Sequence, residues 1–367
     1  MSRIITLSQE PAAAVVVSGA YPGQAGNPVG HTHAPGYPGS LTLYTGDDIT
    51  VSGTAANPII YQFKDFINGV YITASHIKFI GCRFQAPAGA STIDVAIGSP
   101  LNGAFIEFDY CSFVPPVSLA AQPPNGGGYT TWPTGGTGLQ CRPDPIDGTS
   151  IPSPCQIPIT IPYLHGYQYS LICGGSPVTC DHCDFWGFGN SITTVASTGL
   201  LKFQDCWIHD SRYPGSGGED HTDGIGYLDG AAAPQNVVVD QCVIAAEGVE
   251  DGLAAQGSTN GYTNWTVNNC YLTGWDYAFE FFSIPNSNCK ITNNTFGTEV
   301  PWTFAAASAT PVSWWAGRPN GNQWSGNTLK IYPGTSDISA ADKPKWTSVM
   351  NGYFVYPDGT YHATDFV

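Results

Sequence analysis

Apolar residues recur along this chain in one template, at positions i, i+2, i+5 and i+7, and position i+5 is small and usually cysteine. Alternation with period two predicts a strand with one buried face. The step of three in the middle of the template predicts a tight bend between two short strands. Eight segments fit: Ile77-Phe79-Cys82-Phe84, Ile106-Phe108-Cys111-Phe113, Val178-Cys180-Cys183-Phe185, Leu201-Phe203-Cys206-Ile208, Val237-Val239-Cys242-Ile244, Trp265-Val267-Cys270-Leu272, Cys289-Ile291-Asn294-Phe296 and, more weakly, Asn322-Trp324-Asn327-Leu329.

The bends and the spacing of the copies together indicate a solenoid. Turn-forming residues stand at the expected bend in several copies, namely Gly81, Asp205, Asn269 and Gly326. Repeats spaced by roughly 20–50 residues are typical of stacked architectures. We therefore expect an all-β fold, a right-handed parallel β-helix. The copies at Ile106 and Val178 stand further apart than the others, and we expect more than one coil between them.

The regions that flank the template predict the limits of the solenoid. Residues 1–60, rich in Pro and Gly, should form an extended N-terminal segment with a capping coil, and 61–331 should form the β-helix. A Pro/Gly-rich stretch at about 115–162 should protrude as a long loop. Residues 332–367 lose the template and should form a C-terminal β cap, with a hairpin over Tyr353–Tyr361.

The cysteines follow the template and not a disulfide framework. Stacked coils should place the i+5 thiols in one buried, reduced column, since free Cys behaves as a small hydrophobic residue. Asn294 and Asn327 continue that column as an amide ladder. Cys141 and Cys155 lie outside the template and are the one pair considered for a disulfide. The column itself comprises Cys82, Cys111, Cys183, Cys206, Cys242 and Cys270.

Charge and composition restrict the partners. The formal net charge is −16, with 12 Lys and Arg against 28 Asp and Glu. This balance argues against nucleic acid, anionic membrane surfaces and strongly anionic polysaccharides, all of which need basic patches. No apolar run reaches the ~18 residues of a membrane span. We expect no signal peptide, no membrane insertion and a surface suited to neutral glycans.

A second strand precedes several copies and carries the densest polar cluster. Aligning its apolar residues places Asn190, Asp223, Asp251 and Tyr277 in one column. Three interpretations stay open: a carboxylate pair for glycoside hydrolysis, a Ca²⁺ site with oxygen ligands, or Asp-Gly turns in which Asp accepts backbone N–H bonds. The catalytic candidates are Asp223, Asp251, Glu250 and His221, and no further cofactor or metal is expected.

Aromatic residues outside the core positions are candidates for stacking on sugar rings. Trp186 and Trp207 follow template bends and should point outward. The same residues could equally pack on the coil surface or in a subunit interface. The full set of candidate binding residues is Trp186, Trp207, Trp275, Glu280, Trp314 and Trp315.

The chain resembles the pectin-lyase-like, right-handed parallel β-helix repeat proteins of actinobacteria and their phages. The resemblance covers nearly the whole length and implies fold more than activity, because the scaffold hosts many functions. It rests on Ala20-Tyr21-Pro22-Gly23, Leu41–Gly46, Trp207–Asp210, His221–Ile225, Glu250–Leu253 and Trp324–Asn327.

Polygalacturonases are similar at two points, where His221-Thr222-Asp223 and Glu250-Asp251 match their acidic motifs. The similarity implies that these carboxylates would be catalytic. The family's His-Gly motif is replaced by Tyr277-Ala278, and its Arg-Ile-Lys motif by Cys289-Lys290-Ile291. A galacturonate hydrolase is therefore not favoured. Lyase chemistry is not favoured either, because the cluster offers only Arg212 as a base.

The leading hypothesis is a bacteriophage virion structural protein, a tail fibre, tail spike or head decoration, that recognises the host surface or a glycan. It would be a homotrimer located in the virion and in contact with other virion proteins. The alternative is a glycoside hydrolase or lyase acting on a neutral cell-envelope glycan. A cell-surface adhesin, which would be extracellular, is a third class.

Overall fold

The computed structural model describes 41–85, 93–98, 105–114, 139–140, 157–158, 169–173, 176–186, 188, 190–194, 199–209, 223–227, 235–246, 251–255, 261–274, 277–281, 287–297, 312–314, 321–330, 353–355 and 361–363. These residues contain strands and no helix. Consequently, no described segment provides a helix long and apolar enough to cross a membrane. The predicted pair Cys141 and Cys155 lies outside the described residues.

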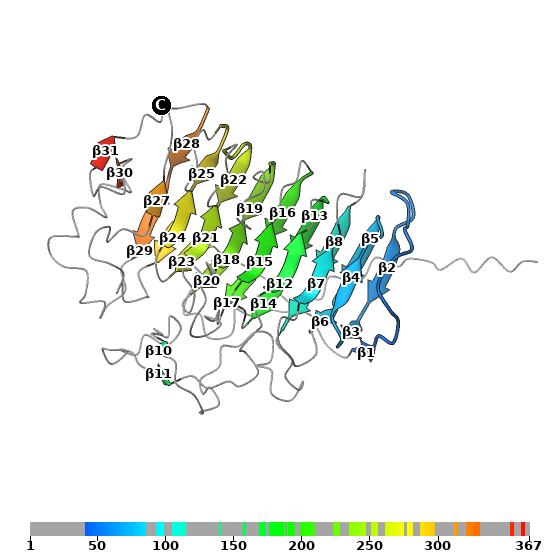
Figure 1. The fold of residues 1–367 in the computed structure, drawn as a ribbon. Coiled ribbons are helices and arrows are strands. Elements are labelled where there is room, and N and C mark those ends of the chain that lie inside the picture. Colours follow the sequence, from blue (N-terminus) through cyan, green and yellow to red (C-terminus); the bar gives the residue numbers. More distant parts are fainter. Residues whose placement is uncertain are drawn as a thin grey trace, which may run out of the picture.

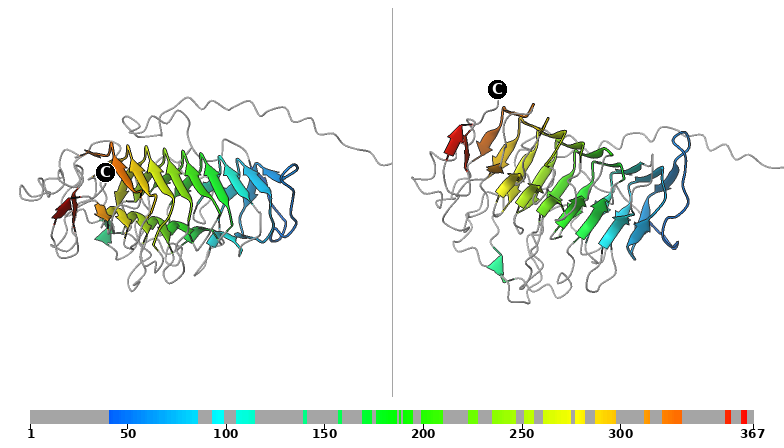
Figure 2. Two further views of the ribbon diagram at one scale, coloured as in Figure 1. Left: turned by 90° about the horizontal axis from the view of Figure 1, so that it is seen from above. Right: turned by 45° about the horizontal axis from the view of Figure 1, so that its top comes forward.

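Three parallel sheets stack coil upon coil along one axis, which makes the molecule a parallel β-helix (Figures 1 and 2). The first sheet has ten strands: β1 (Thr42–Leu43), β3 (Lys64–Phe66), β6 (Arg83–Phe84), β9 (Ser112–Phe113), β14 (Asp184–Trp186), β17 (Trp207–His209), β20 (Val243–Ala246), β23 (Tyr271–Gly274), β26 (Thr295–Gly297) and β29 (Thr328–Lys330).

The second sheet has nine strands and carries the first half of each template copy: β2 (Ile59–Gln62), β5 (Ile77–Ile80), β8 (Ile106–Asp109), β13 (Val178–Asp181), β16 (Leu201–Gln204), β19 (Val237–Asp240), β22 (Trp265–Asn268), β25 (Lys290–Thr292) and β28 (Gln323–Ser325). The third has eight strands: β4 (Val70–Ile72), β7 (Ile93–Ile97), β12 (Tyr169–Cys173), β15 (Asn190–Thr194), β18 (Asp223–Tyr227), β21 (Asp251–Ala255), β24 (Tyr277–Phe281) and β27 (Val312–Trp314).

Two short antiparallel pairs stand outside the three sheets. Strand β10 (Leu139–Gln140) pairs with β11 (Ile157–Pro158). Strand β30 (Tyr353–Val355) pairs with β31 (Tyr361–Ala363), which confirms a hairpin close to its predicted limits.

One prediction about the coils is wrong. Strands β8 and β13 are direct hydrogen-bonded neighbours, with Ile106 opposite Val178. In the same way β9 pairs with β14, and β7 pairs with β12. The residues between Ile106 and Val178 therefore belong to a single coil with a long insertion, and not to more than one coil. Spacing in the sequence cannot separate an added coil from an inserted loop.

The template residues fill the core. The side chains of Ile77, Phe79 and Phe84 are 0% exposed, and they belong to one buried cluster that includes most of their equivalents in the other coils. Aromatic rings stack between coils, with centroids 5.1 Å apart for Phe84 and Phe113 and 4.4 Å apart for Phe113 and Phe185. Each buried aromatic side chain contributes about 1.5–3 kcal/mol through removal of its surface from water.

The bend between the nine-stranded and ten-stranded sheets takes one residue in the left-handed region in each coil. Gly81, Asp205, Asn269 and Gly326 have φ between 50° and 69°, which confirms the predicted turn positions. Phe63, Tyr110, His182, Gln241 and Asn293 occupy the same position in the remaining coils with φ between 51° and 58°. The bend sets the next residue, at i+5, to point inward.

The i+5 side chains form the predicted column, and each donor has a defined acceptor. Cys183 Sγ lies 3.3 Å from Phe108 O of the preceding coil, and Cys242 Sγ lies 3.4 Å from Phe203 O. Asn294 Nδ2 makes the equivalent bond to Val267 O at 2.9 Å. Thiols and side-chain amides in this column therefore donate equivalent hydrogen bonds to backbone carbonyl groups of the preceding coil. The nine described cysteines are all buried thiols and form no disulfide among the described residues.

Candidate functional site

The predicted polar column of the eight-stranded sheet is confirmed at the level of register. Asp223 lies opposite Asp251, and Asp251 lies opposite Tyr277. Asn190 precedes Asp223 by one coil, because Ile192 lies opposite Ile225. The Asn190 Oδ1 accepts a hydrogen bond from Asp223 N at 3.0 Å, in a buried position. These residues therefore stack from coil to coil as the sequence predicted.

Asp223 is the one catalytic candidate whose side chain is described. It is 4% exposed. A Cβ placed on Gly226 would collide with Asp223 Oδ2, so the carboxylate occupies the space that Gly226 leaves open. Gly226 stands on the outward side of its strand, since its neighbour Ile225 belongs to the core. The Asp223 carboxylate is thus directed toward the outer face of the sheet.

Polar side chains gather on that outer face. Val95, Leu171 and Ile192 point into the core, so the residues directly before or after each of them on the same strand point outward. These outward residues are Asp94, Ser170, Ser191 and Thr193, which are 0%, 0%, 0% and 2% exposed. The registers place Asp94 beside Ser170 and Ser170 beside Ser191 on consecutive strands.

The three hydroxyl groups on this face form no hydrogen bond among the described residues. Within the part of the chain that the structure describes, the side-chain oxygens of Ser170, Ser191 and Thr193 are buried and have no hydrogen-bond partner. We call these three residues the hydroxyl row. A buried hydroxyl group without a partner costs about 1–3 kcal/mol. Buried unpaired groups are uncommon in native proteins and call for an explanation.

Glu280 continues the same outer face further along the solenoid. It is 1% exposed and lies opposite Ala254 and Ser313. Because Gly226 stands two strands away from Glu280, roughly 10 Å separates their backbones at about 4.8 Å per strand. Glu280 and Asp223 therefore provide two acidic groups on one face.

Of the interpretations left open for Trp207, the structure agrees with packing on the coil surface. This side chain does stand outside the main core, as its position after the bend indicated. It is only 1% exposed, however, and packs with Val243 and Tyr271 of the next two coils. Trp207 therefore belongs to a buried strip on the ten-stranded sheet, and not to an exposed sugar-stacking surface.

Several candidates have no described side chain. Glu250, His221, Trp275 and Trp315 lie outside the described residues. The backbones of Asp251, Trp186 and Trp314 are strand residues, but their side chains lie outside the described set. The roles suggested for these residues remain predictions.

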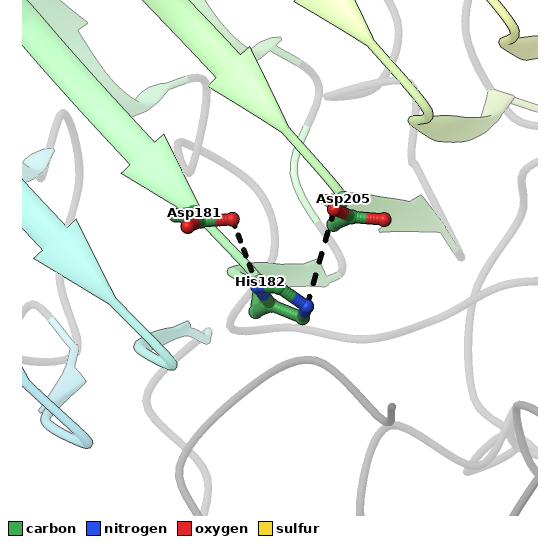
Figure 3. Close-up of side chains that lie close together, drawn as sticks. All are labelled: Asp181, His182 and Asp205. Atoms are coloured by element: carbon green, nitrogen blue, oxygen red, sulfur yellow. Dashed lines mark hydrogen bonds and ion pairs between the residues drawn. The ribbon is translucent and has the colours of Figure 1, made fainter. Parts of the chain in front are cut away.

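A second polar cluster, which the sequence analysis did not single out, lies on the outer side of the bend. Asp181 Oδ1 lies 2.8 Å from His182 Nδ1, and Asp205 Oδ2 lies 4.0 Å from His182 Nε2 (Figure 3). The ring of Tyr110 stacks on the imidazole at 4.7 Å with an interplanar angle of 18°. These residues could have been found by comparing the bend position between copies, because His182 and Asp205 occupy it in successive coils.

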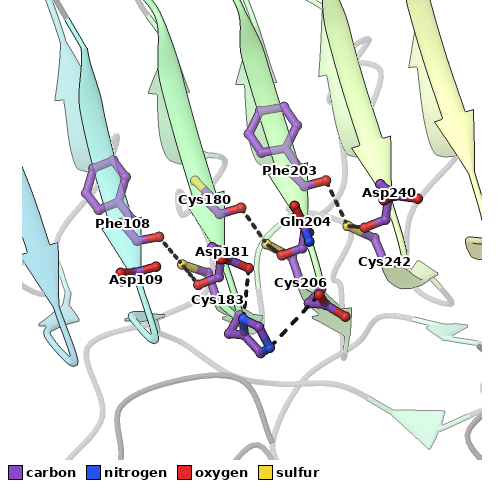
Figure 4. Close-up of polar contacts among 12 residues, drawn as sticks. Phe108, Asp109, Cys180, Asp181, Cys183, Phe203, Gln204, Cys206, Asp240 and Cys242 are labelled. Atoms are coloured by element: carbon purple, nitrogen blue, oxygen red, sulfur yellow. Dashed lines mark hydrogen bonds and ion pairs between the residues drawn. The ribbon is translucent and has the colours of Figure 1, made fainter. Parts of the chain in front are cut away.

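The electrostatics of this cluster are dominated by the two carboxylates. Burial acts to lower the pKa of His182, but the hydrogen bond and charge of Asp181 and the charge of Asp205 outweigh it, so the pKa is raised. Figure 4 shows the thiol column on the inner side of the same bend, with Cys183, Cys206 and Cys242 directed at carbonyl groups. At this bend the thiols therefore lie on the inner side, and Asp181, His182 and Asp205 lie on the outer side.

Comparisons with known proteins give no match: no family model, no curated protein and no solved structure is similar to the chain.

Proposed function

We propose that this protein is a host-recognition component of a bacteriophage virion, built on a right-handed, pectin-lyase-like β-helix, that binds a neutral glycan along the outer face of its eight-stranded sheet. The observation that carries the glycan part is the hydroxyl row, Ser170, Ser191 and Thr193, whose buried oxygens have no partner among the described residues. The virion part is supported by the resemblance of the sequence to β-helix proteins of actinobacteria and their phages.

A glycan is a suitable partner for the hydroxyl row because each sugar offers several donors and acceptors along its length. Adjacent strands repeat at about 4.8 Å. A linear polysaccharide lying across the strands can therefore meet the oxygens of Ser170 and Ser191 in succession. Bonds of this kind would remove the cost of leaving buried hydroxyl groups unpaired.

The charge of the face favours a neutral ligand. Asp94, Asp223 and Glu280 stand on it, and the eight strands of this sheet contain no Lys or Arg. An anionic polysaccharide would be repelled by these carboxylates, with no cation on the strands to compensate. This repulsion would select neutral polysaccharides over anionic ones. These positions are 0–4% exposed, so they must become more accessible before a glycan can reach them. We therefore expect association slower than the usual ~10⁵–10⁷ M⁻¹s⁻¹.

The alternative is a glycoside hydrolase at the same face. Asp223, stacked in register with Asp251, and Glu280 supply carboxylates on neighbouring coils. Two carboxyl groups ~5–9.5 Å apart are the working distance of most glycosidases. Hydrolysis would additionally need one of these carboxyl groups to stay protonated near neutral pH, whereas recognition makes no such demand.

The test is to titrate the intact protein with neutral polysaccharides extracted from actinobacterial envelopes, with polygalacturonate as the anionic control. Saturable binding to a neutral polymer without release of new reducing ends supports recognition. Release of reducing ends that disappears in Asp223→Asn and Asp251→Asn, with folding intact, establishes the hydrolase instead. Binding to polygalacturonate alone would refute both proposals for this face.

We further propose that the protein acts as a homotrimer, joined through the N-terminal segment and the tail beyond Lys330, and attached to other virion proteins. The first coil supports an interface there, since five large apolar side chains are between 39% and 69% exposed: Leu43, Val51, Ile60, Phe63 and Tyr71. Open strand edges and exposed apolar groups need covering. Sedimentation should give three times the mass of the chain, and a monomer at micromolar concentration would contradict the proposal.

A further inference from the structure

We propose that Asp181, His182 and Asp205 form a binding site for a divalent transition metal ion such as Zn²⁺. The three side chains lie together at the bend (Figure 3). None of them belongs to the hydroxyl row, so the site is independent of the glycan-binding proposal. One potential ligand atom from each of the three residues lies within 4.8 Å of the other two.

The imidazole of His182 is held in one orientation by its surroundings. Its backbone is fixed at the bend, where φ is 52° and the amide donates to Gln204 O at 3.0 Å. Tyr110 stacks on one face of the ring, and Asp181 lies 2.8 Å from Nδ1. With the proton on Nδ1 and bonded to Asp181, the lone pair of Nε2 is directed at Asp205. A carboxylate behind a histidine is the usual arrangement at protein metal sites.

The distance between His182 Nε2 and Asp205 Oδ2 is one that a bound metal ion could span, and it is too long for a direct hydrogen bond. The 4.0 Å from Nε2 to Oδ2 is too long for a hydrogen bond. It is close to the sum of a metal–nitrogen bond of about 2.0–2.1 Å and a metal–oxygen bond of about 2.0–2.2 Å. Closing the gap by roughly half an ångström gives a tetrahedral angle at the metal with those bond lengths.

The donor set selects the class of ion. The imidazole of His182 and the carboxylate of Asp205 supply the ligand atoms. The carboxylate of Asp181 behind the ring brings the charge of the cluster to −2, which a divalent cation balances. Imidazole nitrogen suits Zn²⁺, Co²⁺ and Ni²⁺, whereas Ca²⁺ and Mg²⁺ prefer sites made of oxygen alone. The side chains of His182 and Asp205 are 18% and 14% exposed, so an ion can enter from solvent and complete its coordination with water. The net charge of −16 further raises the local cation concentration.

The experiment is a titration of the intact, chelator-treated protein with Co²⁺ above neutral pH, followed by competition with Zn²⁺. Co²⁺ reports its own coordination through visible absorption, which is far stronger for four ligands than for six. We expect a saturable band that Zn²⁺ removes. The chain has 8 histidines, so each result is compared with a variant that lacks His182.

Two variants remove ligands while preserving the bend. His182→Asn and Asp205→Asn introduce the residue that Asn269 and Asn293 already provide at this position with φ of 53° and 58°. Each should remove one bound ion and the band. Asp181→Asn should weaken binding by about 10–100-fold, as expected for a residue that orients a ligand.

The matched control is Asp240→Asn, which removes one negative charge from the next coil and leaves Asp181, His182 and Asp205 in place. Unchanged Co²⁺ binding in this variant supports a defined site. Equal loss in Asp240→Asn and Asp205→Asn would show that the ion only follows the charge of the surface, and the proposal would fall. Absence of any ion removable by His182→Asn would equally overturn it and leave the cluster as a proton-bridged ion pair.

Discussion

Two stacks of small, buried, polar side chains run along this solenoid, and they differ in how their hydrogen bonds are satisfied. In the thiol column at the bend, Cys183, Cys206 and Cys242 each contact a backbone carbonyl of the preceding coil. In the hydroxyl row on the eight-stranded sheet, the oxygens of Ser191 and Thr193 contact no acceptor or donor among the described residues. The thiol column has hydrogen-bond partners within the protein, which indicates a structural role. The hydroxyl row has no such partners among the described residues, which indicates a binding site for an external ligand.

The largest expected effect comes from placing a charge in the column. Cys206 is 0% exposed and its thiol lies 3.5 Å from Cys180 O. Cys206→Asp should destabilise the fold by about 3–5 kcal/mol, because a buried carboxylate there has no cation. Cys206→Asn is the matched control and should cost much less, since Asn294 and Asn327 already fill this position. Urea unfolding measures both, and equal losses would show that the column does not accept amides.

Alkaline pH should reveal the next largest effect. Burial raises the pKa of Cys173 from 9.0 to about 12 and that of Cys289 from 9.0 to about 11. A folded-state pKa above the unfolded value means that stability is complete below pH 9 and falls as pH rises toward the folded value. The slope should be about 1.4 kcal/mol per pH unit for each such thiol. Cys173→Ala should flatten the decline in unfolding free energy, and an unchanged slope would contradict the assignment.

Gly226→Ala should have an intermediate effect on the outer face. The new methyl group collides with the Asp223 carboxylate, and overpacking of this kind costs about 1–3 kcal/mol. The double variant Asp223→Ala with Gly226→Ala should recover most of the loss, because the collision partner is gone. A double-mutant cycle from thermal unfolding measures the coupling, and additive losses would place the Asp223 side chain elsewhere.

The smallest effect separates two neighbouring threonines on one strand. The hydroxyl of Thr194 donates to Gly226 O at 3.1 Å, whereas that of Thr193 has no described partner. Thr194→Val should therefore cost about 1 kcal/mol or more. Thr193→Val should be neutral or slightly stabilising, because it removes a buried unpaired group. If Thr193→Val lost more unfolding free energy than Thr194→Val, the Thr193 hydroxyl would have a partner, and the hydroxyl row would not differ from the thiol column in this respect.

The sequence was sufficient for features that repeat with the coil. The template places Phe79, Cys82 and Phe84 in the core, and all three are 0% exposed. The alignment of apolar residues also sets the register of Asp223 opposite Asp251. Each of these features follows from alternation and from one bend per coil, which are local and repeated.

Features that depend on contacts between non-repeating parts could not be predicted. Trp207 packs with Val243 and Tyr271 of later coils, a contact that alternation alone does not report. The hydroxyl row was missed because Ser and Thr are ordinary strand residues, and only the structure shows that their oxygens lack partners. The single coil between Ile106 and Val178 follows from strand pairing, which the length of an insertion conceals.

The most direct test of the difference between column and row is a binding isotherm of the intact protein with a neutral envelope polysaccharide, compared between Thr193→Val and Thr194→Val. The two variants remove the same hydroxyl group from adjacent residues of β15. We predict that Thr193→Val weakens binding by at least about tenfold, the factor that corresponds to one hydrogen bond of about 1.4 kcal/mol, while Thr194→Val binds as the unaltered protein does. Equal affinity of Thr193→Val and the unaltered protein would contradict the assignment of the hydroxyl row as the binding surface.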